Sequence, residues 1–145
     1  MNMYNTLKTL GNLHVFFPHK NKEVAFIYFI MSIEDKFNHK KNKIKIGVST
    51  DPKKRILGLQ TGNPCELKMV YFFPVDSEDS FHLEENLHIK FKNMLHRGEW
   101  FIPKRKLWKW VKAHKKLAKK YSAKKIIKRV GGEYIVIKKA VDCYF

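Results

Sequence analysis

Alternating apolar side chains predict three β-strands, at residues 24–31, 43–48 and 67–73. Both sides of the first strand are apolar, so we expect it at the centre of a sheet, covered on each face. The other two strands would complete this sheet. Across the predicted elements we expect six side chains to be buried: Ile27, Phe29, Ile46, Ile56, Leu87 and Phe91.

The second strand leads directly into a helix, predicted at residues 52–60. Alternation places Lys45 on the strand face opposite its isoleucines. Asp51 is expected to cap the helix, and Pro52 loses no hydrogen bond because an N–H at the first helical position has no partner within the helix. Arg55 therefore lies in the first turn of this helix.

Two further helices are indicated by apolar side chains at helical spacing. The first covers residues 79–95, and the second begins after Pro103, with lysines around its apolar stripe. Gly62 is expected to end the preceding helix in the left-handed conformation, and Pro64 prevents continuation. The apolar stripes are Leu83, Leu87, Phe91 and Met94 in the first helix, and Leu107, Trp110, Val111, Leu117 and Tyr121 in the second.

The chain of 145 residues is long enough for one domain with a modest core. We predict an α+β fold in residues 24–103, with a small three-stranded antiparallel sheet flanked by helices. Residues 1–23 are expected as an N-terminal extension, in which Phe16-Phe17-Pro18 is an extended segment packed on this domain, and residues 104–145 as a basic helical extension. Within the extension, a pair of glycines breaks the helical pattern before a short predicted strand at residues 134–137.

Charge is the most unusual feature of the composition. Thirty basic side chains against 13 acidic ones give a net charge of +17 at pH 7. Residues 102–145 carry 15 basic and 2 acidic side chains, whereas residues 1–101 carry 15 and 11. Such a balance is expected when the partner is densely negative, and nucleic acid is the first candidate. The asymmetry fits a near-neutral fold with an extension that binds phosphates.

Several other kinds of site are not supported by the sequence. Cys65 and Cys143 stand far apart without ligand-like spacing, which predicts neither a disulfide framework nor a zinc knuckle. His82 and His88 are six positions apart on a helix and point away from each other, which argues against zinc. The longest apolar run has about eight residues, against the ~20 needed to cross a bilayer. We therefore expect a soluble intracellular protein without a membrane partner or a small-molecule cofactor.

Four short motifs follow one another along the chain. They are F-I-Y at residues 26–28, I-G-V-S-T-D-P-K-K-R-I at 46–56, L-E-E-N-L-H at 83–88 and G-E-W-F at 98–101. Together they resemble the core of the GIY-YIG endonuclease superfamily, whose two name motifs lie on paired strands before a helix that carries an arginine. The resemblance covers roughly residues 24–103. It is greatest with the branch that includes the bacteriophage T-five DNA-binding domain, in which Q-T-G-x-P and L-H…G-E-W-F are typical.

This resemblance implies a DNA endonuclease that hydrolyses phosphodiester bonds with a single divalent cation, Mg²⁺ or Mn²⁺. It aligns Glu84 with the metal-binding glutamate of the family. The reaction needs a deprotonated water in line with the phosphorus and positive charge on the non-bridging oxygens. One Mg²⁺ takes only one or two protein carboxylates because it keeps waters and substrate oxygens, so a single glutamate is sufficient.

The resemblance also implies roles for four other residues. Arg55 would clamp a phosphate through its planar, permanently charged guanidinium, and Tyr28 would assist deprotonation of the attacking water. Lys45 stands where the second name motif has a tyrosine, and it could act as a base or as a phosphate contact. Leu59 occupies a position where many relatives carry histidine or tyrosine. His88 could fill that gap from the neighbouring helix.

Further DNA contacts are expected from exposed cations, namely Lys53, Lys54, Lys104, Arg105, Lys109, Lys112 and Lys116. The polar loop at residues 34–43 could contact DNA through its lysines and His39, or it could simply be solvated. Likewise, the acid and the tryptophan of G-E-W-F could support the site or only pack. Because Lys45 and Leu59 depart from the family pattern, one alternative is a catalytically inactive DNA-binding protein of this fold. RNA binding or host interaction is a third reading, which rests on charge alone.

Overall fold

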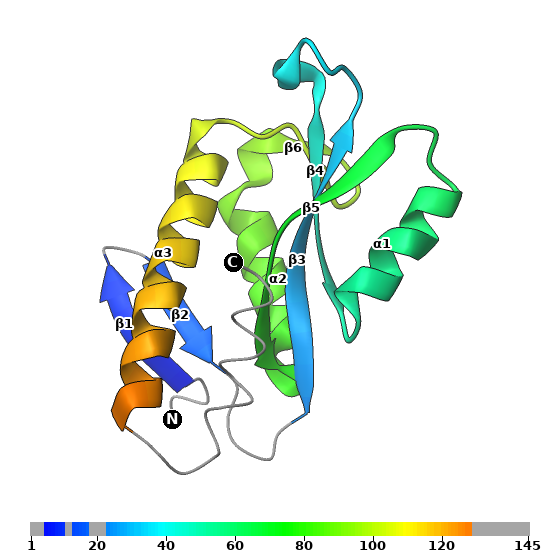
Figure 1. The fold of residues 1–145 in the computed structure, drawn as a ribbon. Coiled ribbons are helices and arrows are strands. Elements are labelled where there is room, and N and C mark those ends of the chain that lie inside the picture. Colours follow the sequence, from blue (N-terminus) through cyan, green and yellow to red (C-terminus); the bar gives the residue numbers. More distant parts are fainter. Residues whose placement is uncertain (1–4, 11–12, 18–22, 129–145) are drawn as a thin grey trace.

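A computed structural model describes residues 5–10, 13–17 and 23–128 of the chain. Its centre is a five-stranded antiparallel sheet in the order β5-β3-β4-β7-β6 (Figure 1). β3 has neighbours on both sides, as its two apolar faces predict. The strands are β3 (Val24–Ile33), β4 (Lys43–Ser49), β5 (Glu66–Asp76), β6 (Leu95–Arg97) and β7 (Trp100–Phe101).

The sheet is wider than predicted, so the expectation of three strands was wrong. β6 and β7 contain three and two residues, too few for an alternating pattern to be visible. Gly98, with φ of 59°, lies in the turn between them. β7 joins the edge of β4, with Phe101 opposite Ile44 and Trp100 opposite Lys45. The G-E-W-F motif thus adds a strand beside the second name motif.

The strands that carry the two name motifs pair with each other. β3 and β4 are antiparallel, with Tyr28 opposite Gly47 and Ile30 opposite Lys45. Directly opposed residues lie on the same face of a sheet. Tyr28, Gly47 and Lys45 therefore share one face, and the isoleucines of β4 lie on the other.

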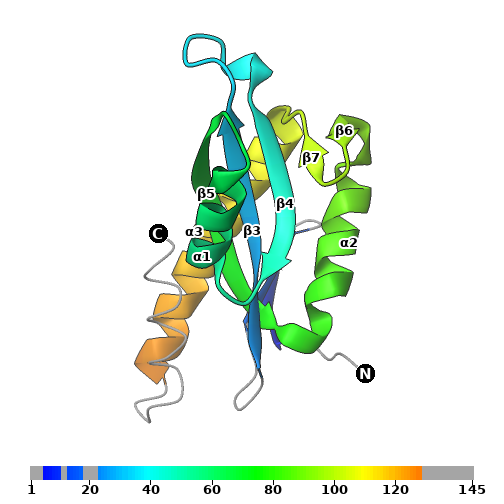
Figure 2. The same cartoon turned by 90° about the vertical axis from the view of Figure 1, so that its right-hand side faces the viewer.

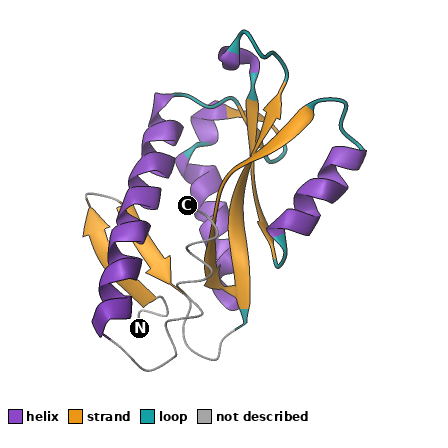
Figure 3. Cartoon of the chain, in the orientation of Figure 1, coloured by secondary structure: helices purple, strands orange, loops and turns teal. Residues whose placement is uncertain are grey.

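Helices cover both faces of this sheet (Figures 1 and 3). α1 (Pro52–Thr61) lies on one face, and α2 (Ser80–Lys90) and α3 (Arg105–Lys128) lie on the other (Figure 2). α2 is shorter than the predicted helix at residues 79–95, because a 3₁₀ turn, η3 (Lys92–Met94), takes over its end. The other 3₁₀ turns are η1 (His39–Lys41) and η2 (Ser77–Asp79).

The sheet divides the core into a large and a small cluster. The large cluster, between the sheet and α2 and α3, includes Ile27, Phe29, Ile44, Ile46, Leu87, Phe91, Phe101 and Leu107. The small cluster, on the side of α1, is built from Tyr28, Ile30, Leu67 and Phe72. Five of the six predicted core residues are buried. Ile56 is only partly buried, because it packs on the smaller cluster from the outer helix α1.

Side-chain hydrogen bonds define both ends of α1. The Asp51 carboxylate accepts a first-turn N–H at 3.1 Å, which confirms the predicted cap. At the other end Gly62 has φ of −97°, so the prediction of a left-handed residue there was wrong. The Gln60 side chain holds this end instead. Its amide nitrogen donates to the Cys65 carbonyl at 2.8 Å, and its oxygen accepts the Leu67 N–H at 2.7 Å.

α3 contributes its first half to the large cluster, where Leu107 and Val111 are buried. The side chains of Leu117 and Tyr121 lie outside the described residues, as do the predicted glycine break and final strand. Neither α3 nor any other helix in the described part of the chain is long and apolar enough to span a bilayer.

The N-terminal segment forms a hairpin of its own. β1 (Asn5–Leu10) and β2 (Leu13–Phe17) pair antiparallel in a separate two-stranded sheet. β2 lies against α3 and β5 (Figure 1). The segment is therefore extended and packed on the domain, as expected, although alternation does not predict its hairpin.

Candidate active site

Tyr28 packs against the backbone of β4 at Gly47. Its side chain is buried, with 2% of the residue exposed. A Cβ at position 47 would lie 2.4 Å from the Tyr28 hydroxyl oxygen and 2.5 Å from Cζ, closer than real Cβ contacts allow. Glycine is therefore required for the phenol to occupy this position.

Charged groups surround the Tyr28 phenol. Burial raises the pKa of Tyr28 to about 12. The charge of Arg55 opposes this shift, and those of Glu99 and Glu84 add to it. Coulomb interactions weaken with distance, so all three groups lie close enough to the phenol to influence its ionisation. At neutral pH Tyr28 keeps its proton.

Lys45 is held by two residues at the β7 edge of the sheet. Its ammonium forms an ion pair with the Glu99 carboxylate and lies 5.9 Å from the centre of the Trp100 ring. The Ile46 N–H donates to the Glu99 carbonyl at 3.1 Å, which fixes the Glu99 backbone beside β4. Lys45 thus presents its charge on the same face as Tyr28.

Glu84 and Glu99 form a carboxyl pair that links α2 to the β6–β7 turn. Partial burial and then the charge of Glu99 raise the pKa of Glu84. Burial would also raise the pKa of Glu99, but the hydrogen bond and charge of Lys45 outweigh it and lower that pKa. A hydrogen bond between the two carboxyl groups contributes to both shifts, because it raises the pKa of Glu84 and lowers that of Glu99.

His88 is oriented by the backbone of β4. Its Nε2 lies 2.9 Å from the Ile46 carbonyl oxygen and 3.7 Å from Glu84 Oε1. A carbonyl can only accept a hydrogen bond, so Nε2 carries the hydrogen and the lone pair of the neutral ring is on Nδ1. The ring also meets Phe101 edge to face, with centroids 5.2 Å apart. Glu84 and His88 therefore lie on one side of α2, as their spacing predicts.

Arg55 reaches the site from the opposite helix. It is exposed in the first turn of α1 and lines a groove between α1 and the end of β4. Its charge lowers the pKa of Tyr28. Leu59, one turn further along α1, packs on the small cluster that contains Tyr28. An apolar contact thus occupies the position where many relatives carry histidine or tyrosine.

The predicted DNA-binding cations fall into two sets. Lys53 and Lys54 are exposed beside Arg55 on α1. The second set is exposed at the start of α3 and along it: Lys104, Arg105, Lys109, Lys112 and Lys116. α3 lies across the sheet from α1 (Figure 1). The structure therefore brings the first set to the face of Tyr28 and keeps the second set apart from it.

The donor set at the candidate site suits a magnesium or manganese ion. Glu84 and Glu99 offer two neighbouring carboxylates, and Mg²⁺ prefers oxygen ligands of this kind while it retains several waters. Repulsion between the two groups contributes to the raised pKa of Glu84, and a divalent cation bound between them can relieve it. A separate acidic group, Asp76, Glu78 and Asp79, brings ligand atoms within 4.8 Å of one another where β5 leads to α2.

Sequence reasoning does not single out Glu99 and Gly47 as site residues. Glu99 lies in the G-E-W-F motif, which is the one signal for it. Its pairing with Lys45 depends on β7, and a two-residue strand leaves no alternating pattern. The role of Gly47 depends on the β3–β4 register, which places Tyr28 directly opposite it. Both residues become visible only when cross-strand neighbours are known.

Comparison with known protein families gives one match. A family model described as the T5orf172 domain matches residues 25–117. The match runs from the start of β3 into α3 and so includes every residue of the candidate site. No curated protein and no solved structure matches the chain.

Proposed function

The chain belongs to the T5orf172 domain family, a phage-associated family related to nuclease-like folds, and on that premise we propose that it is a metal-dependent DNA endonuclease of the GIY-YIG type. The family match supports a nuclease or DNA-binding domain of phage type. The catalytic part of the proposal rests on one observation, the carboxyl pair of Glu84 and Glu99 beside the buried Tyr28 phenol. Paired acids, a phenol and neighbouring cations are the groups that phosphodiester hydrolysis needs.

Arg55 and Lys45 would hold the phosphate. The Arg55 guanidinium is exposed and offers a planar donor fork that matches two phosphate oxygens. The Lys45 ammonium is paired with Glu99 and has no lone pair with which to accept a proton. Of the two roles open to Lys45, this pairing favours the phosphate contact over the general base.

Glu84 and Glu99 would hold the divalent cation. When bound, Mg²⁺ or Mn²⁺ would stabilise the negative charge that develops on the phosphate oxygens. Lys45 favours the ionised form of Glu99, because its hydrogen bond and charge lower the pKa of that carboxyl. His88 would then orient Glu84, because its ring is fixed between Phe101 and a β4 carbonyl.

Tyr28 would orient the attacking water, and the phenolate form of its side chain would accept the proton of that water. A pKa of about 12 makes the free phenol a poor acceptor at neutral pH. The negative charges of Glu84 and Glu99 are part of the cause, so neutralising them lowers the pKa of Tyr28 and favours proton transfer.

A second function, DNA binding without catalysis, is favoured by a different observation. Lys45 already neutralises Glu99 from within the chain, as a cation would. In addition, Leu59 replaces a polar residue of many relatives with an apolar contact. A site that has lost metal binding would keep this geometry, together with its exposed cations.

Incubation of the purified chain with supercoiled and branched DNA separates the two functions. We expect cleavage with Mg²⁺ or Mn²⁺ and none when a chelator is added. DNA binding is measured in parallel by fluorescence anisotropy in the presence of the chelator. Binding without cleavage of any substrate under either metal would reject the endonuclease and leave the binding module.

A further inference from the structure

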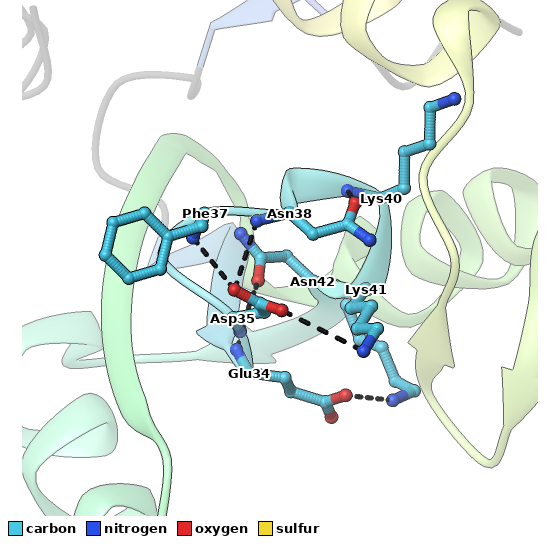
Figure 4. A network of polar contacts seen from close by, with 8 residues as sticks. Glu34, Asp35, Phe37, Asn38, Lys40, Lys41 and Asn42 are labelled. Atoms are coloured by element: carbon cyan, nitrogen blue, oxygen red, sulfur yellow. Dashed lines mark hydrogen bonds and ion pairs between the residues drawn. The ribbon is translucent and has the colours of Figure 1, made fainter.

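The loop between β3 and β4, residues 34–42, is an ordered knob at one end of the sheet (Figure 4). The Asp35 carboxylate accepts the N–H groups of Phe37 at 2.8 Å and Asn38 at 3.1 Å. The Asn38 side chain in turn accepts the Lys40 N–H at 3.2 Å, which starts η1. Side-chain hydrogen bonds of this kind fix the conformation of a turn without the backbone hydrogen bonds of a β-sheet.

Asn42 anchors the knob to the domain. It is 1% exposed, and its side-chain oxygen accepts the N–H groups of Glu34 at 3.0 Å and Asp35 at 3.4 Å. These bonds close the base of the loop across the hairpin, because Asn42 precedes β4 and Glu34 follows β3. The loop is therefore prearranged, and little conformational entropy would be lost when it binds a partner.

The charges of the knob leave it cationic. Residues 34–43 contain four lysines and two acids. Each acid is paired with a lysine, Asp35 with Lys41 at 3.8 Å and Glu34 with Lys43 at 2.6 Å. The other two lysines, Lys36 and Lys40, are exposed. The outer part of the knob thus presents two further positive charges to its surroundings.

Phe37 lies between these lysines and is 98% exposed. The ring points away from the polar network, as the Lys40 side chain also does (Figure 4). A single exposed apolar side chain is ordinary on a protein surface. Here the ring stands on a turn whose backbone is held by hydrogen bonds and is flanked by cations. Aromatic rings in cationic surroundings are the groups on which nucleic-acid bases stack.

A groove connects the knob with the candidate active site. It is lined by Ser32 and Lys43 at the base of the hairpin, and by Arg97 and Trp100 on the other side. Trp100 also contacts Lys45 of the candidate site. Lys43 and Lys45 lie on one face of β4, since they are two residues apart. The groove, which Glu34 also lines, therefore contains Arg97 and Lys43, and both lysines of this face are paired with acids, Lys43 with Glu34 and Lys45 with Glu99.

The distance from Tyr28 to the hairpin matches a short run of duplex. Tyr28 is five residues from Ile33, the end of β3, which is about 17 Å of strand at ~3.3 Å per residue. Stacked base pairs are about 3.4 Å apart, so this distance corresponds to roughly five base pairs. A duplex whose phosphate lies at Arg55 and Tyr28 would then reach the knob about half a helical turn away.

We propose that the knob is a second DNA contact of this chain, in which Phe37 enters the duplex as a wedge between two base pairs and stacks on the face of a base, while Lys36 and Lys40 contact the flanking phosphates. The proposal rests on DNA being the substrate of the candidate site. The proposed contact places the DNA along the groove, past Trp100 and toward the knob. Of the two readings that the sequence leaves open for this loop, it selects DNA contact over solvation.

The test uses the full chain with chelator present, so that binding is measured without cleavage. A duplex carries the fluorescent base 2-aminopurine at one position, which is moved stepwise along the strand. We expect a fluorescence change at one or two adjacent positions with wild type and with Phe37→Trp. Phe37→Ala and Phe37→Leu should abolish this change and weaken affinity by roughly 5- to 150-fold, the range for loss of one stacked base. Circular dichroism and thermal unfolding should be unchanged, because the ring is exposed.

Each outcome decides one proposal. Wild-type DNA binding that Phe37→Ala leaves equally tight, with the same fluorescence response, would overturn the knob contact and leave the proposed function standing. Phe37→Leu that behaves as wild type would overturn stacking, because leucine keeps the apolar contact without a ring. Absence of DNA binding by wild type would overturn the proposed function and the knob contact together.

Discussion

The two faces of the central sheet carry different kinds of residue, although they belong to the same strands. On the side of α2 and α3, Ile27, Phe29 and Ile46 enter a large apolar cluster. On the side of α1, the intervening Tyr28 and Lys45 meet charged groups from three other elements. Neighbouring side chains on β3 or β4 thus point to opposite faces of the sheet, one into the main core and the next toward the candidate site.

This difference follows from how each face is covered. α2 and α3 together close one face, whereas α1 is the one helix of the described part of the chain that lies on the other, over the small cluster (Figure 2). On that face, the outer part of β4 contacts polar side chains and the G-E-W-F segment. Substitutions in the large cluster should therefore change stability, and those among the charged groups around Tyr28, including Glu84 of α2, should change DNA chemistry.

Leu107→Ala should have the largest effect on stability. Leu107 is fully buried in the large cluster, and removing a buried leucine costs about 2–5 kcal/mol through lost burial and the cavity left behind. Urea unfolding followed by circular dichroism measures this free energy. The exposed neighbour Lys106→Ala is the control and should stay within about 0.5 kcal/mol. Equal losses in the two variants would contradict the assignment of α3 to the core.

Gly47→Ala should lower cleavage strongly on the other face. A Cβ there would meet the Tyr28 hydroxyl at 2.4 Å, so the phenol has to move. A displacement of about 1 Å in a catalytic site can cost about 100-fold in rate. Single-turnover cleavage of a labelled duplex measures the loss. Gly58→Ala in α1 is the matched control, since its added Cβ meets nothing within 4 Å. Full cleavage by Gly47→Ala would remove Tyr28 from the mechanism.

Acid should destabilise the α2–α3 face through His114. This residue is 1% exposed, stacks on Trp110 and hydrogen-bonds the Tyr71 hydroxyl at 2.8 Å. Burial lowers the pKa of His114 from 6.5 to about 3. Below pH 6.5 the His114 imidazole therefore binds a proton in the unfolded chain but stays neutral in the folded chain. The free energy of unfolding falls by about 1.4 kcal/mol for each pH unit between pH 6.5 and pH 3.

His114→Gln isolates this effect, because glutamine can keep a hydrogen bond to Tyr71 and does not titrate. The free energy of unfolding of wild type and variant is compared between pH 7 and pH 5. The difference between them should stay constant above pH 6.5 and shift in favour of the variant below it. If the free energy of unfolding changed equally with pH in wild type and variant, His114 would take up its proton without unfolding.

The smallest expected effect concerns the lysines of α3. Replacing Lys109, Lys112 and Lys116 by glutamine should weaken DNA binding similarly for all sequences. Each phosphate contact that is lost lowers the log–log salt slope by about 0.9. Substitution is preferable to deletion of α3, because Leu107 and Val111 belong to the core. Lys53 and Lys54 on α1 are the comparison pair. An unchanged slope in the triple variant would show that the α3 lysines only solvate their helix.

The parts of the fold with regular patterns could be predicted from the sequence. Alternation along β3, β4 and β5 spans seven residues or more, and Asp51 with Pro52 marks a helix start that the structure confirms. β6 and β7 were missed because their lengths are below one clear period. Gly62 does not adopt the left-handed conformation because the Gln60 side chain bonds across the end of the helix, which no local propensity encodes.

The candidate site could be predicted only as far as single motifs reach. Among the residues proposed from the motifs, Arg55 and Glu84 carry charges that shift the pKa of Tyr28. The partner of Lys45 could not be foreseen, since Glu99 is 54 residues away and meets it through a strand too short to predict. The exposure of Phe37 was equally hidden, because a phenylalanine among lysines could have folded back onto the domain.

The central claim, that the group of charged side chains around Tyr28 cuts DNA, is tested most directly by comparing Glu84→Ala with Glu85→Ala, both on α2. Glu84 belongs to the carboxyl pair, whereas its neighbour Glu85 is exposed. Cleavage of branched DNA with Mg²⁺ and binding with chelator are measured on the same preparations. We predict that Glu84→Ala loses roughly 100-fold or more in cleavage, keeps its DNA affinity within a few-fold, and that Glu85→Ala resembles wild type. Wild-type cleavage by Glu84→Ala would contradict the claim.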